Sequence, residues 1–172
     1  MTIFETERLV VREVKPEDVG ELLGIYSKAE NMCFISSGKY NWTKEELCEK
    51  YAGTNKDYEF GFGIFVVEQK ETKKIIGEAA LFNSFKDHKK LELGYIIDSM
   101  YWENGFGKEI AKGLIDYSFV KLSVRALIAR MYAKNSSSVR LSEKCGMTRI
   151  EDGTAENGER FFVYEIKKEN NS

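Results

Sequence analysis

The chain has 172 residues, 42% of them hydrophobic and 31% charged, with a net charge of −2. This is a globular composition, and the length suits a single domain over residues 1–172 with a sizeable core. The net charge leaves no basic excess that would recruit nucleic acid or an anionic membrane. No apolar run approaches the roughly 20 residues that span a bilayer.

The N-terminal third is expected to hold one strand and two helices. The segment "RLVVREV" (8–14) alternates and is rich in valine, which is typical of a strand. A Pro-Glu-Asp run at 16–18 suits the start of a helix with apolar residues along one face. After a loop over 33–41, Thr43 and a glutamate three residues later form a capping box, which predicts a second helix over 44–56.

The rest of the chain reads as six strands and two helices around one crossover. Segment 62–98 contains three apolar runs separated by the polar turns "QKETKK" and "KDHKK", so we expect three antiparallel strands. A helix after Gly107, a strand over 125–133, a short helix stopped by Gly146 and a final hairpin follow. The crossover helix should place strand 125–133 parallel to strand 90–98. The tail "ENNS" is expected to fray.

Added together, the pattern is a mixed α/β (α+β) fold with a mostly antiparallel, seven-stranded sheet and about four helices. The segment "LELGYIIDSMYWENGFG" carries a buried strand into a helix through Gly105 and Gly107. Glycines at a helix start let an anion approach unpaired backbone N–H groups, and the helix dipole favours a phosphate there. From this pattern alone, an equally good interpretation is that the glycines only shape a tight loop and bind no anion. The spacing is neither that of a Walker loop nor that of a dinucleotide fingerprint.

Three segments together resemble the GNAT N-acetyltransferases, and in particular their RimJ/RimL-like branch. "WENGFG" is similar to the family's acetyl-CoA motif, [Q/R]-x-x-G-x-[G/A]. "ETERLVVREVKPED" is similar to the branch's opening, and "NSSSVRLSEKCGM" is similar to its N-x-x-S-x-x-x-x-E-K-x-G-F segment. The three segments occur in the family's order and span most of the chain.

The resemblance implies a GNAT fold, with a splayed parallel pair of central strands, and an acetyl-CoA site. The implied cofactor-binding residues lie on the central strand, on the loop and helix start and beyond the second parallel strand: Ile96, Ile97, Asn104, Gly105, Phe106, Gly107, Lys108 and Asn135. The branch usually has glycine after the tryptophan, where this chain has Glu103, which we expect to point into solvent.

Glu92 is the candidate general base. It alternates out of phase with the apolar residues of "KLELGYIID", so it shares a face with Gly94 and Ile96 on the strand that would carry the cofactor. It also matches the acidic residue of the branch's E-x-G-Y segment; a solvated carboxylate is the alternative. The family's usual acid, a tyrosine, is absent, and Ser138 is the candidate substitute, with capping or packing of the following helix as its alternative.

The predicted reaction is direct acetyl transfer from acetyl-CoA, as co-substrate, to a primary amine in a ternary complex without metal. The acceptor is either a protein N-terminus or a small amine, and an acyl-CoA-binding module with little turnover is the alternative function. An enzyme acting on a nucleotide phosphate is a third hypothesis. The cysteines are odd in number and widely spaced, which fits a cytoplasmic protein. We expect no nucleic-acid or membrane partner, and a homodimer is left open.

Overall fold

A computed structural model describes residues 1–35 and 37–169 of the chain; residue 36 in the expected loop, and residues 170–172 of the expected frayed tail, lie outside the described part. The strands within these ranges are β1 (Thr2–Glu5), β2 (Leu9–Glu13), β3 (Gly63–Gln69), β4 (Ile75–Phe82), β5 (Lys90–Ile97), β6 (Ala126–Tyr132), β7 (Thr148–Thr154) and β8 (Arg160–Lys167). The α-helices are α1 (Val19–Tyr26), α2 (Ala29–Met32), α3 (Lys44–Thr54), α4 (Phe106–Val120) and α5 (Ser136–Lys144). None of the described helices is both long and apolar enough to cross a membrane.

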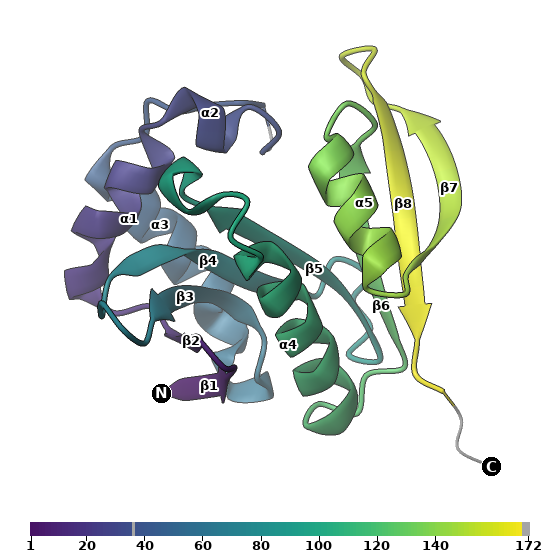
Figure 1. Cartoon of the computed structure of the whole chain (residues 1–172), viewed down its shortest axis with the longest axis horizontal. Helices are drawn as coiled ribbons and strands as arrows, with labels where there is room; N and C mark the ends of the chain where they lie inside the picture. The colour runs from purple at the N-terminus through teal and green to yellow at the C-terminus, as the bar shows by residue number, and fades with distance from the viewer. Residues whose placement is uncertain (36, 170–172) are drawn as a thin grey trace.

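The strands form one open sheet in the order β1-β2-β3-β4-β5-β6-β8-β7 (Figure 1). All neighbouring pairs are antiparallel except β5 and β6, which are parallel as the crossover through α4 predicts. The last strand, β8, inserts between β6 and β7, so the C-terminal hairpin pairs with β6 through its second strand.

Helices cover both faces of the sheet and divide the core into two clusters. On one face α4 packs against the central strands through Ile110 and Leu114, which are fully buried with Leu91 of β5. On the other face α1 and α3 contribute Leu22 and Leu47 to a second cluster. Figure 1 shows α4 crossing the sheet near β5, with α5 beside β6 and β8. Strands β3 and β4 are therefore covered on both sides, which explains why their residues are almost all buried.

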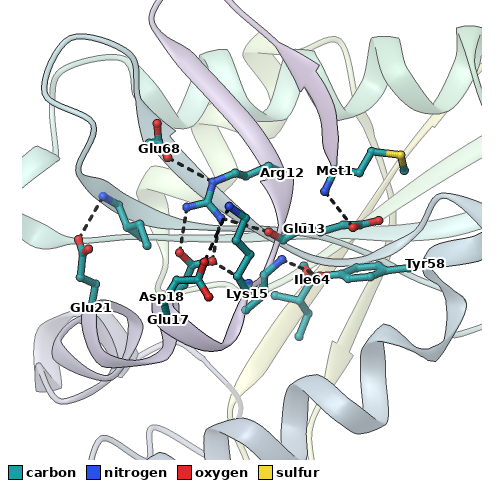
Figure 2. Close-up of polar contacts among 12 residues, drawn as sticks. Met1, Arg12, Glu13, Lys15, Glu17, Asp18, Glu21, Tyr58, Ile64 and Glu68 are labelled. Carbon is teal, nitrogen blue, oxygen red and sulfur yellow. Dashed lines mark hydrogen bonds and ion pairs between the residues drawn. The ribbon is translucent and has the colours of Figure 1, made fainter.

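A buried ion pair fixes the entry to α1 (Figure 2). The Arg12 guanidinium of β2 donates to both carboxylate oxygens of Asp18 at 2.7 and 2.9 Å, and the Lys15 backbone N–H donates to the same carboxylate at 2.7 Å. Burial alone would raise the pKa of Asp18, but these hydrogen bonds hold its pKa below the usual value. Arg12 also reaches Glu68 of β3, so the pair ties α1 to the first strands.

The expected fold class is confirmed, with small differences in the elements. Thr2–Glu5 forms an additional edge strand, which makes eight strands rather than seven, because four residues are too short for a periodic signal of their own. Ala29–Met32 forms a one-turn helix just before the expected loop. The capping box at Thr43 is present, but its helix ends at Thr54 and continues as a 3₁₀ helix over Asn55–Phe60.

Candidate active site

The parallel pairing of β5 and β6 is short, and this opens a wedge in the sheet. Only the register pairs from Lys90 to Glu92 on β5 join the two strands in the described chain. Beyond them β5 continues to Ile97 beside β4, and β6 continues to Tyr132 beside β8. The facing edges of the two strands therefore separate from Leu93 onward, and backbone groups of a central strand are left without a strand partner.

The ladder alternation shows which backbone groups face the wedge. The Asp98 N–H donates to the Ile76 carbonyl across β4 and β5, so every second residue back along β5, including Ile96, directs its backbone groups toward β4. Tyr95 and Ile97 direct theirs toward the wedge. The Ile97 carbonyl accepts a 2.8 Å hydrogen bond from the indole N–H of Trp102, so part of this edge is already satisfied.

Helix α4 begins at the open end of this wedge with uncapped N–H groups. Its N-cap is Gly105, at φ +79°, which is a left-handed conformation that favours glycine, and no side chain caps the helix there. The first backbone N–H with an intrahelical partner is that of Glu109. The N–H groups of Phe106, Gly107 and Lys108 thus have no partner in the described chain and carry the positive end of the helix dipole.

Gly107 has a different role from Gly105. A Cβ added at Gly107 would lie 2.9 Å from Leu141 of α5 and 3.5 Å from Ile97 of β5. The missing side chain therefore lets the first turn of α4 lie close to both α5 and the end of β5, where the wedge opens. Two glycines stand at this helix start because one takes a left-handed conformation and the other permits close packing.

The wedge, the start of α4 and the start of α5 enclose a cavity of about 560 Å³. Seven of the expected cofactor-binding residues line it: Ile96, Ile97, Gly105, Phe106, Gly107, Lys108 and Asn135. Asn104 does not line it, because its carbonyl accepts from Arg8 and its amide donates to the Trp102 carbonyl. Lys108, Arg140 and Lys144 make one wall basic, while Glu30 and Glu103 add negative charge.

The start of α5 brings two hydroxyl groups together inside the wedge. Asn135 is the N-cap of α5, and its side-chain oxygen accepts from the Ser138 N–H at 3.2 Å. The Ser138 side chain lies near the Tyr95 hydroxyl. Burial raises the pKa of Tyr95, and Ser138 partly opposes this shift. Both residues line a second cavity of about 120 Å³ beside the first.

Glu92 lies at the closed end of the wedge. It pairs with Phe82 of β4 and with Ile128 of β6, and it lines neither of the two cavities. It makes no hydrogen bond or ion pair within the described chain. As expected from the alternation, Glu92 shares the face of Gly94 and Ile96, opposite to the face of Tyr95. The structure thus brings Ser138 to the wedge and leaves Glu92 at its base.

Two side chains of this site were not among the sequence candidates. Tyr95 was read only as an apolar strand residue, although a tyrosine on a buried face signals that its hydroxyl needs a partner. Arg8 contacts the loop before α4 and the first turn of α4 from the β1–β2 turn, about a hundred residues earlier in the chain. Only the tertiary structure could bring it there.

The family model "Acetyltransferase (GNAT) domain" matches residues 8–148, well over half of the chain. YoaA of Bacillus subtilis, whose name is "Uncharacterized N-acetyltransferase", is 25% identical over 150 residues, which are 86% of this chain and 83% of that protein.

Solved structures share the fold at lower identity. A GNAT-family acetyltransferase from Bacillus anthracis superposes with a TM-score of 0.83 at 22% identity, covering 97% of this chain and 98% of its own. Spermidine N-acetyltransferase from Vibrio cholerae, in complex with CoA and spermine, gives 0.82 at 21%, covering 94% and 96%. RimL, a ribosomal L7/L12 α-N-protein acetyltransferase in complex with coenzyme A, gives 0.84 at 14%, covering 97% and 98%. The matched family model, the relatives and the open sheet with its wedge agree, and the chain belongs to the GNAT family of N-acetyltransferases.

Proposed function

We propose that this chain transfers an acetyl group from acetyl-CoA to a primary amine in a ternary complex, as a member of the RimJ/RimL-like branch. The observation that carries the proposal is the row of free N–H groups at Phe106, Gly107 and Lys108, which opens into the cavity at the wedge. A diphosphate fits this row because both the donors and the helix dipole favour an anion. The free cysteines agree with a cytoplasmic site of action.

The wedge supplies a place for the pantetheine arm, which is an extended chain carrying amide groups. Tyr95 and Ile97 offer backbone donors and acceptors along the open edge of β5, and Asn135 offers a side-chain amide on the other side. An arm bound in this way would hydrogen-bond to the open edge of β5 as an added β-strand does. Its thioester end would then lie deep in the wedge, near the Tyr95 and Ser138 hydroxyls.

The chemistry needs a proton removed from the amine and a proton given to the thiolate. We assign Glu92 the role of general base. Because it lies at the base of the wedge, outside both cavities, it would act through a water molecule. As the amine nitrogen forms its bond to the acetyl carbon, the carbon–sulfur bond breaks. We assign the return of a proton to the leaving sulfur to Ser138, which lines the second cavity together with Tyr95.

The acceptor is proposed as one of two amine classes. A protein N-terminus is supported by the fold shared with RimL, and a small polyamine is supported by the fold shared with spermidine N-acetyltransferase. The second candidate function, an acyl-CoA-binding module with little turnover, is favoured by one observation. Glu103 places a carboxylate in the wall of the cavity, which opposes tight binding of a diphosphate.

Calorimetry with CoA and free-thiol release from acetyl-CoA across an amine panel test the proposal. We expect CoA binding and release of thiol with at least one class of amine. The Glu92→Gln variant should lose about 100-fold in turnover at neutral pH and recover at alkaline pH, where the free amine needs no base. Glu156→Gln, an exposed glutamate in the β7–β8 turn, is the matched control. Binding without release for every amine would establish the binding module instead, and full activity of Glu92→Gln would remove Glu92 from the mechanism.

A further inference from the structure

The turn between β1 and β2 lies against the start of α4. Arg8 of this turn donates from Nη1 to the Asn104 carbonyl at 2.9 Å. Its Nε donates to Glu109 Oε2 at 2.8 Å, and its Nη2 lies 2.7 Å from the same oxygen. The guanidinium carbon stands 4.3 Å from the centre of the Phe106 ring. The Arg8 side chain thus contacts Asn104 in the loop before α4, and Phe106 and Glu109 in the first turn of α4.

The carboxylate of Glu109, which binds Arg8, is itself held by further hydrogen bonds. Glu109 also accepts hydrogen bonds from the Thr6 hydroxyl and, at 2.8 Å, from the Arg8 backbone N–H. Burial alone would raise the pKa of Glu109, but these hydrogen bonds keep its pKa below the usual value, so the carboxylate stays charged at neutral pH. The planar fork of Arg8 is therefore held at one edge and presents its other edge to Asn104.

The loop that Arg8 holds is strained. Glu103 at φ +62° is left-handed, a conformation that is unfavourable for a non-glycine residue, whereas Gly105 at φ +79° adopts it without a steric penalty. Local contacts supply part of the constraint, through Trp102 and the Asn104 side chain. Arg8 adds a constraint from a distant part of the chain, on the carbonyl that lies between the two left-handed residues.

We propose that Arg8 is a positioning residue for cofactor binding: by holding the Asn104 carbonyl and the Phe106 ring, it aims the free N–H groups of α4 at the diphosphate. This rests on the proposed function of the loop and adds the β1–β2 turn to the cofactor site. Loss of the guanidinium should weaken binding of a ligand that uses the diphosphate site. A thioester that lacks the diphosphate should not sense the change.

The test compares wild type with Arg8→Ala, Arg8→Lys and the control Arg160→Ala, an exposed arginine on β8. Calorimetry measures the affinity for CoA, and steady-state kinetics are measured with acetyl-CoA and with S-acetylpantetheine, which has no diphosphate. For Arg8→Ala we expect the Kd for CoA and the KM for acetyl-CoA to rise about tenfold, with kcat within about twofold of wild type. Its kcat/KM for S-acetylpantetheine should stay unchanged, and Arg160→Ala should match wild type throughout.

Arg8→Lys separates position from charge, since lysine keeps the charge and loses the fork. We expect it to retain little of the lost affinity. Wild-type affinity in Arg8→Lys or Arg8→Ala, or an equal loss with both thioesters, would overturn the role of Arg8 while leaving the proposed function intact. Failure of the wild-type protein to bind CoA would instead overturn the proposed function, and the role of Arg8 with it.

Discussion

Replacing Glu103 by glycine should make the protein more stable and strengthen its binding of CoA. Glu103 adopts φ +62° immediately before the loop reaches the N-cap Gly105, and its exposed side chain stands in the wall of the cavity. The resembled branch usually has glycine at this position. The left-handed backbone gives that preference a physical reason, because glycine takes this conformation without a steric penalty.

The expected magnitude follows from two opposing terms. A left-handed conformation costs a non-glycine residue about 1–2 kcal/mol, and glycine gives back about 0.5–1 kcal/mol through the greater freedom of its unfolded chain. The net gain is about 0.5–1 kcal/mol, or about 2 °C in Tm for a domain of this size. Loss of the carboxylate should also raise the affinity for CoA about threefold at low ionic strength and less at high salt.

Thermal unfolding and calorimetry with CoA, applied to wild type, Glu103→Gly and Glu103→Gln, separate the two effects. Glutamine removes the charge and keeps the backbone cost, so it should bind CoA as well as the glycine variant does and unfold at the wild-type temperature. Two results would refute the reasoning. A glycine variant no more stable than the glutamine variant would show that the loop is not strained, and wild-type affinity in both variants at low salt would show that the carboxylate lies out of range of the diphosphate.

Three further predictions concern packing, pH and access to the cavity. Gly77→Ala should destabilise the fold by about 3 kcal/mol in a urea titration, because its Cβ would lie 2.1 Å from a carbonyl oxygen of β5. Gly24→Ala in α1 is the control: nothing lies within 4 Å of its added Cβ, so the change should stabilise the fold by about 0.5 kcal/mol. Equal effects of the two changes would contradict the packing argument. The lowered pKa of Asp18 contributes stability that is present above its unfolded pKa of about 3.9 and is lost as the pH falls through the folded value. Asp18→Asn should therefore cost about 2 kcal/mol at pH 7 and show a flatter loss of stability in acid, and a wild-type acid profile in the variant would rule this out. Of the exposed thiols, Cys33 lines the cavity and Cys48 does not, so CoA should slow alkylation of Cys33 alone; protection of both thiols would argue against binding at this site.

Local patterns predicted most of the elements, because each depends on residues that are close together in the sequence. The capping box at Thr43 and the stop at Gly146 were readable in this way. The edge strand Thr2–Glu5 was missed because its four residues gain their structure from pairing with β2. A helix after Gly107 was expected, and it begins at Phe106. The left-handed conformation of Glu103 was not expected, since nothing in the sequence indicates that a glutamate would adopt it.

The candidate site divides in the same way. A motif of neighbouring residues placed Gly105, Gly107 and Lys108 at one helix start, and all three line the cavity. Alternation along β5 put Glu92 and Tyr95 on opposite faces, but it could not show that the strands part only beyond Glu92. That point decides whether a side chain lies in the wedge or at its base.

By itself the sequence determined the order of strands and helices, the glycine-bearing helix start and the parallel crossover, because short-range sterics, periodicity and chain connectivity govern these. The tertiary structure alone decided where β5 and β6 separate, that β8 inserts between β6 and β7, and that Arg8 reaches the loop before α4. Those features depend on contacts between residues far apart in the chain, and such contacts exist only once the two faces of the sheet have been packed.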